Sequence, residues 1–172
     1  MQDTINHSIE IYTDGSCHTQ LCVGAWASII LVNGNVINLS GVVDSTTHNR
    51  MEILAVLKAL EYIMEKINHP NLKITVVSDS QYVVGLIDRR SKFSLSDYKT
   101  KAGNDIRNID LVLRLFYFTD NLDINFDRIV SNSEVYDPDG SVLRSEQSIE
   151  EKEKTKEQGR FFQRLLLFHF KK

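Results

Sequence analysis

The sequence has no long apolar run and no recognisable targeting segment. Runs such as LLLF at 165–168 are far shorter than the roughly 18–20 apolar residues that a membrane span needs. The first residues, MQDTINHS, lack the basic and apolar parts of a secretory signal. We therefore expect neither a membrane span nor secretion.

Cysteine is also scarce, since Cys17 and Cys22 are the two in the chain. Two thiols so close together, without a second pair, make neither a disulfide framework nor a typical zinc site. A reducing compartment is the default for such a chain. We therefore predict a cytoplasmic protein.

Basic charge is not in excess, because the net charge is −3, whereas proteins that bind nucleic acids are usually basic. The charge is nevertheless uneven along the chain. In the segment 88–101, five basic residues stand against two acidic ones, which leaves a local charge of +3. A solvated surface loop is the simplest interpretation of this basic segment.

Alternating polarity predicts strands at 8–13, 24–31 and 36–41. Asn33-Gly34 separates the last two, and this dipeptide between apolar runs is a typical hairpin turn. These three strands should therefore form an antiparallel meander.

A helical period follows. One apolar stripe consists of Ile53, Leu57, Leu60, Met64 and Ile67, and the residues NHPN at 68–71 should end the helix. Further elements are expected as a buried strand at 73–78, helices at 81–88 and 104–118, and a strand at 122–130.

This order predicts an α/β domain with a mixed five-stranded sheet flanked by helices. Strands one to three should be antiparallel, and strands one, four and five parallel. A chain of 172 residues suits a single domain, with its core at about 8–130. A polar loop and a C-terminal helix are predicted within 131–172, where Phe161, Leu165 and Phe168 share one side and favour docking on the domain.

Two aspartates follow the ends of strands that we predict to be parallel neighbours. Asp14 follows the first strand and Asp79 the fourth. The carboxyl ends of such strands form the edge where α/β sheets bind ligands, and neighbouring strands are less than about 5 Å apart. Each residue also has a structural interpretation, Asp14 as part of a turn and Asp79 as a helix cap.

Glu52 is the third candidate. Asn49 and Glu52 have the spacing of a capping box. However, Val56, Ala59 and Ile63 follow Glu52 on an apolar face that should point at the sheet. We therefore favour a role in the site over a role in capping.

Three clustered carboxylates repel one another unless cations compensate their charge, and Mg²⁺ prefers oxygen ligands. Two such ions can activate a water and stabilise the leaving oxygen when a phosphodiester is cleaved. The five histidines show no metal-ligand spacing, and we expect them at the surface. They are His7, His18, His48, His69 and His169.

Three segments of the chain resemble the signatures of the type 1 ribonuclease H family. They are YTDGSC at 12–17, TTHNRMEILAVLKAL at 46–60 and SDSQYV at 78–83. They occur in the family's order, with Glu52 38 positions after Asp14 (52 − 14) and Asp79 27 positions after Glu52 (79 − 52). With NIDLVLRL at 108–115, the resemblance covers roughly residues 8–130.

The resemblance implies a ribonuclease H-like fold and an endonuclease that hydrolyses the RNA strand of RNA/DNA hybrids. The products would carry 5′-phosphate and 3′-hydroxyl ends, and two Mg²⁺ ions (or Mn²⁺) would assist. Asp14, Glu52 and Asp79 would be the catalytic metal ligands. The residues implied to contact nucleic acid are Ser16, Thr47, Asn49 and Gln81, together with Arg89 and Arg90 of the basic segment.

The resemblance ends after the fifth predicted strand. Relatives continue with a Gly-His loop and a helix that carries a fourth metal-binding aspartate, whereas this chain continues with SNSE at 131–134. Glu134, Asp137, Asp139 or no residue at all remain alternatives for the fourth ligand. A degenerate homologue that binds hybrid or another nucleic acid with little or no cleavage is the alternative function. DNA-cutting relatives of the same fold are a third possibility.

Overall fold

The structure is a computed structural model that describes residues 8–67 and 71–128. All of these fall in the first of the two units, Met1–Ile129 and Val130–Lys172, into which the chain divides. The loop and the C-terminal helix predicted within 131–172 lie outside the described residues, as do the candidate ligands Glu134, Asp137 and Asp139.

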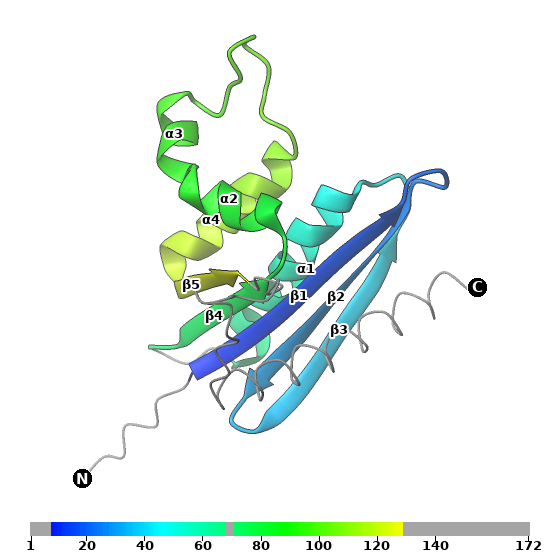
Figure 1. The fold of residues 1–172 in the computed structure, drawn as a ribbon. Helices are drawn as coiled ribbons and strands as arrows, with labels where there is room; N and C mark the ends of the chain where they lie inside the picture. The colour runs from blue at the N-terminus through cyan, green and yellow to red at the C-terminus, as the bar shows by residue number, and fades with distance from the viewer. Residues whose placement is uncertain (1–7, 68–70, 129–172) are drawn as a thin grey trace, which may run out of the picture. The chain divides into compact units, whose positions relative to one another are not determined.

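A five-stranded mixed sheet forms the centre of the described unit (Figure 1). Its strands are β1 (Ser8–His18), β2 (Val23–Val32), β3 (Asn35–Val43), β4 (Lys73–Ser78) and β5 (Asp123–Arg128). The order across the sheet is β3-β2-β1-β4-β5. β1, β2 and β3 are antiparallel, and β4 runs parallel to both β1 and β5. The predicted sheet is therefore confirmed.

The turn between β2 and β3 forms where the sequence predicts it. Asn33 and Gly34 both have positive φ, 50° and 75°, which a two-residue turn of type I′ requires. The turn fixes the register of the hairpin, in which Val32 pairs with Asn35. The meander of the first three strands follows from this register.

The helices are α1 (His48–Tyr62), α2 (Gln81–Asp88), α3 (Arg90–Leu95) and α4 (Ile109–Asn121). α1 connects the meander to β4 and contacts β1, β2 and α4 (Figure 1). It is therefore buried on two sides, with Leu57 and Leu60 as well as Val56 and Ala59 inaccessible to solvent. Each fully buried valine or leucine side chain contributes about 1.5–3 kcal/mol to folding.

One member of the predicted apolar stripe lies at the surface. Met64 is 38% exposed, because the last turn of the helix, Ile63–Ile67, is π-helical. A π turn bonds residues five apart and so changes the direction in which the following side chains point. The simple helical period therefore fails at its last turn.

Other boundaries also differ from the prediction. β1 continues past residue 13 to His18, because β2 keeps pairing with it after the alternation of polarity has stopped. α4 begins at Ile109 instead of 104, after Asn108 in the left-handed region with φ of 58°. β5 begins at Asp123 instead of 122, and the predicted end at residue 130 lies outside the described residues.

The basic segment contains a helix that the sequence did not predict. α3 has no fully buried residue, but Phe93 packs against the core. A tight turn follows, in which the Thr100 amide donates to the Asn104 carbonyl at 2.7 Å and the Ile106 amide donates to the Tyr98 carbonyl at 2.9 Å. Within the part of the chain that the structure describes, no helix is long and apolar enough to cross a membrane.

Candidate metal and nucleic-acid site

The backbones of β1 and α1 come into direct contact at Gly15. A Cβ atom on Gly15 would lie 2.4 Å from the Glu52 nitrogen and 2.4 Å from the Met51 carbonyl carbon. Real Cβ atoms do not approach backbone so closely, so only glycine fits here. This contact places Asp14, the neighbour of Gly15, beside the start of α1.

Asp79 reaches the same place from β4. The parallel pairing of β1 with β4 ends at Thr13 and Ser78, so Asp14 and Asp79 each follow the last paired residue of their strand. Asp14 itself lies inside β1 and pairs with Ala27 of β2. Asp14 is therefore neither past the end of its strand nor part of a turn, the alternative that its sequence left open, but the two aspartates lie close together as predicted.

Asp79 does not cap α2. Ser80 does so, since its Oγ accepts a hydrogen bond from the Val83 amide at 3.3 Å. The Ser78 Oγ accepts another from the Ser80 amide at 3.2 Å. Two serines thus satisfy the backbone around Asp79 and leave its exposed carboxylate available for other contacts.

Glu52 does not take part in a capping box. The residue before α1 is Thr47, which makes no side-chain capping bond, and Asn49 lies inside the helix. Glu52 is therefore in the second turn, where its side chain is only 4% exposed. The apolar face on which it lies carries it into the interior, as predicted.

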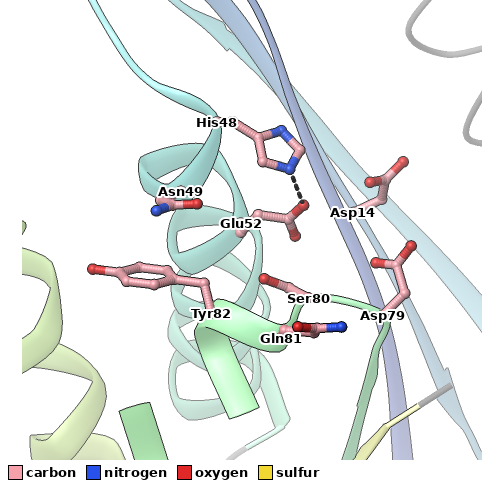
Figure 2. A pocket seen from close by; sticks show the side chains of 8 residues that line it. All are labelled: Asp14, His48, Asn49, Glu52, Asp79, Ser80, Gln81 and Tyr82. Carbon is pink, nitrogen blue, oxygen red and sulfur yellow. Dashed lines mark ion pairs between the residues drawn. The ribbon is translucent and has the colours of Figure 1, made fainter. Parts of the chain in front are cut away.

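The three carboxylates converge (Figure 2). One oxygen from each of Asp14, Glu52 and Asp79 lies within 4.8 Å of the other two. The buried Oε2 of Glu52 has no hydrogen-bond partner, while its Oε1 is 3.2 Å from the Nε2 of His48. An unpartnered buried carboxylate oxygen is costly, so this oxygen is available to a ligand.

The electrostatics of the cluster point to the same ligand. Burial, followed by repulsion from Asp14 and Asp79, raises the pKa of Glu52 to about 8. Burial and Asp79 also raise the pKa of Asp14, against the lowering effects of the Gly15 amide and His48. A hard divalent cation would compensate the repulsion, and the donors are the oxygens that such cations prefer. The residues therefore fit the metal site that the sequence predicts.

A hollow of about 380 Å³ surrounds the cluster. It is lined by Asp14, His48, Asn49, Glu52, Asp79, Ser80, Gln81 and Tyr82 (Figure 2). Asn49 and Gln81 were predicted to contact nucleic acid and lie in this lining. Ser16, Thr47, Arg89 and Arg90 are not part of it.

Three lining residues were not predicted: His48, Ser80 and Tyr82. His48 is exposed, as expected for a surface histidine, but it sits over Glu52. The signal for this was present, because residues 48 and 52 are one turn apart on a helix and therefore share a face.

Hydrogen bonds at the rim join the starts of three helices. Arg50 of α1 binds both carboxylate oxygens of Asp110 on α4, at 2.9 and 2.7 Å. The amide of Asn108, just before α4, donates to the Tyr82 hydroxyl on α2 at 3.0 Å. These bonds hold the first turns of α1 and α2, which carry the two amide residues of the pocket, in fixed relation.

The basic segment uses much of its charge internally. Arg90 forms an ion pair with Asp120, donates to the Thr119 hydroxyl at 2.9 Å and lies 5.2 Å from the centre of the Phe116 ring. Arg89 donates to the Gly85 carbonyl at 2.6 Å.

Lys99 of the same segment pairs with Asp105. Lys92 and Lys101 are exposed. Several of the segment's charges thus stabilise the segment itself.

Comparison with known proteins identifies the family. The model of the RNase H family matches residues 6–133. The chain belongs to the RNase H family. A ribonuclease H of Caldicellulosiruptor saccharolyticus is 32% identical over 127 residues, which are 73% of this chain and 84% of that protein. A ribonuclease H of Nitratidesulfovibrio vulgaris is 38% identical over 109 residues, or 62% of this chain and 67% of that protein.

Solved structures support the RNase H fold. LC9-RNase H1, described as a type 1 RNase H with the type 2 active-site motif, has a TM-score of 0.61 and 18% identity, over 77% of this chain and 67% of that one. A foamy viral protease-reverse transcriptase in complex with dsDNA has a TM-score of 0.61 and 16% identity, over 77% of this chain and 87% of that one. The predicted family, fold and enzyme class, an RNase H-type hydrolase, are thus confirmed.

Proposed function

We propose that this RNase H is an endonuclease that cuts the RNA strand of RNA/DNA hybrids and leaves 5′-phosphate and 3′-hydroxyl ends. Two divalent cations, Mg²⁺ or Mn²⁺, would assist. The observation that carries the proposal is the convergence of Asp14, Glu52 and Asp79 around an unpartnered, buried oxygen of Glu52.

Asp14, Glu52 and Asp79 would hold the cations. When bound, such cations activate a water and stabilise the leaving oxygen of a phosphodiester. The protein's own contribution is positioning. Glu52 is fixed by burial in α1, and Asp14 is fixed by the pairing of β1 with β2. Ligands on such rigid elements keep their geometry better than ligands on loops.

Asn49 and Gln81 would recognise the substrate. Their amide groups lie in the pocket lining beside the carboxylates, and an amide can both donate to and accept from a 2′-hydroxyl. The 2′-hydroxyl is the group that distinguishes RNA from DNA in the minor groove. The bonds of Arg50 and Tyr82 hold these two residues at a fixed spacing, which suits recognition of one strand.

The remaining nucleic-acid contacts stay predictions. Ser16 and Thr47 lie near the carboxylates in the chain but outside the pocket lining. We propose that the basic segment contacts phosphates of the DNA strand, with Arg89 as an exposed donor. Arg90, held by Asp120, would mainly maintain the shape of this surface. A cytoplasmic setting likewise stays a prediction, which the two free cysteines support.

The test is a cleavage assay on labelled RNA/DNA hybrid, double-stranded RNA and double-stranded DNA, each with Mg²⁺, Mn²⁺ or EDTA. The proposal expects metal-dependent cleavage of the hybrid alone, with products that a polymerase can extend from their 3′ ends. Cleavage of the DNA duplex would instead favour a DNA-cutting relative. Binding of the hybrid without cleavage would favour the degenerate alternative.

A further inference from the structure

His48 adds a nitrogen donor beside the three carboxylates. It is the first residue of α1, its side chain is 60% exposed, and its Nε2 is 3.2 Å from the Oε1 of Glu52. Figure 2 shows the imidazole ring directed into the pocket above Glu52. A nitrogen donor therefore stands at the edge of a group of oxygen donors.

The separation of the two atoms suits a shared cation. Two neighbouring donors of one octahedral ion, each about 2.1 Å from the metal, are about 3 Å apart. The Nε2 and Oε1 atoms of His48 and Glu52 are already at nearly this spacing, at 3.2 Å. The direct contact between them can therefore be exchanged for a common ion with little movement.

We propose that the Nε2 of His48 is a fourth protein donor and binds a cation on the Glu52 side of the site. This inference rests on the proposed function, because it assumes that the carboxylates hold metal. His48 is not among the three residues whose donor atoms lie within 4.8 Å of one another. It therefore serves the ion nearest Glu52, and not a position common to all three acids.

The proposal has a consequence for the choice of metal. Imidazole nitrogen suits transition-metal ions, whereas Mg²⁺ strongly prefers oxygen. An ion held by Glu52 and the imidazole of His48 should consequently favour Mn²⁺ over Mg²⁺ more strongly than one held by carboxylates alone. His48 would thus act as a selectivity residue of the metal site.

Pulsed EPR of Mn²⁺ bound to the full chain tests the ligation directly. We expect coupling to a nitrogen nucleus in the unaltered protein and its loss in His48→Ala. His18→Ala is the matched control, because His18 lies outside the pocket that contains the carboxylates, and it should keep the coupling. Bound Mn²⁺ without nitrogen coupling in the unaltered protein would overturn the proposal.

Titration calorimetry with the same three proteins measures selectivity. His48→Ala should weaken Mn²⁺ binding by about tenfold or more and Mg²⁺ binding by less than about threefold. Equal weakening for both metals would mean that His48 only orients Glu52 through a hydrogen bond, and would overturn the proposal. A second variant, His48→Gln, keeps a polar side chain of similar reach without a ring nitrogen and should behave like the alanine variant.

The hybrid cleavage assay separates this inference from the proposed function. Cleavage by a protein whose bound Mn²⁺ shows no nitrogen coupling would refute the role of His48 alone. Nitrogen coupling in a protein that binds metal but cuts no hybrid would refute the proposed function and leave the ligation by His48 standing.

Discussion

The carboxylate pocket and the basic segment both concentrate charge of one sign, but they differ in whether that charge is paired within the protein. In the pocket, three acids converge and Glu52 keeps an oxygen without a partner. In the basic segment, Arg90 pairs with Asp120 of α4, and Lys99 pairs with Asp105 of the adjoining turn. The first arrangement leaves charge to be satisfied by a ligand, and the second satisfies it within the protein.

A run of like charge in a sequence is therefore a weak guide to a binding surface. The charges of such a run can bind a ligand only if the fold does not pair them with opposite charges of the protein. Acids spread over 66 positions, from Asp14 to Asp79, made the stronger site because three separate elements bring them together.

The largest effect is expected from Asp14→Asn. This change removes a carboxylate that we propose holds the cations, so the rate of hybrid cleavage should fall to below about a thousandth. Asp88→Asn is the matched control, since Asp88 is exposed and lies outside the pocket lining, and should retain the rate. Normal cleavage by Asp14→Asn would mean that the metal site is assigned wrongly.

Gly15→Ala should damage the pocket through its backbone. The added Cβ would meet the Glu52 nitrogen at 2.4 Å, so β1 and α1 must separate, and we expect the free energy of unfolding to fall by at least about 2 kcal/mol. Urea denaturation measures this. Gly85→Ala in α2 is the control, because its Cβ would come no closer than 3.4 Å to a flexible arginine side chain. Equal stability of the two variants would contradict the close approach.

The stability of the metal-free protein should depend on pH because the pKa of Glu52 is raised in the folded state. Without metal, the raised pKa of Glu52, about 8 against an ordinary 4.5, means that the folded chain keeps a proton that the unfolded chain releases. The free energy of unfolding should therefore fall as pH rises from about 5 to about 8. Glu52→Gln should remove most of this fall, and Mg²⁺ should stabilise the protein more at the upper end of the range. A metal-free stability that rises steadily over this range would contradict the assignment.

Arg90→Ala should affect stability more than catalysis. It removes the ion pair with Asp120 and the contact with the Phe116 ring, and because both charges are partly exposed we expect a loss of about 1 kcal/mol. Arg90→Lys should restore only part of this, since lysine lacks the planar fork. The rate at saturating hybrid should stay within about threefold, since Arg90 is not in the pocket lining. A large fall in that rate with unchanged stability would show that Arg90 acts on the substrate.

The smallest effect is expected from the double change Lys92→Ala with Lys101→Ala. These exposed side chains should contribute phosphate contacts, so the salt dependence of hybrid binding should lose about one to two units of slope. Folding stability should not change. An unaltered slope would indicate that the basic segment does not contact the substrate.

The fold could be predicted well from local patterns. Alternation of polarity, the Asn-Gly turn and the helical stripe of α1 located most elements, because each pattern depends on the direction of neighbouring side chains. The extension of β1 to His18 could not be predicted, since it depends on pairing with a strand elsewhere in the chain. α3 was missed for the same reason, because Phe93 is anchored by contact with a distant core.

The site shows the same division. The positions of Asp14 and Asp79 followed from the parallel pairing of their strands, and the inward direction of Glu52 followed from its apolar neighbours. The role of Ser80 as the cap of α2 was not predicted, because Asp79 and Ser80 are both good caps and only the geometry of the turn chooses between them. The engagement of Arg90 by Asp120 depends on residues 30 positions apart and leaves no local signal.

The parallel pairing of β1 with β4 also determines at which stage of folding the three acids can come together. These strands are separated by the whole of β2, β3 and α1, and pairings between such distant segments form late in folding. A chain still emerging during synthesis, before residue 79 is available, therefore lacks one of the three acids. Nuclease activity should therefore appear only after β4 has paired with β1.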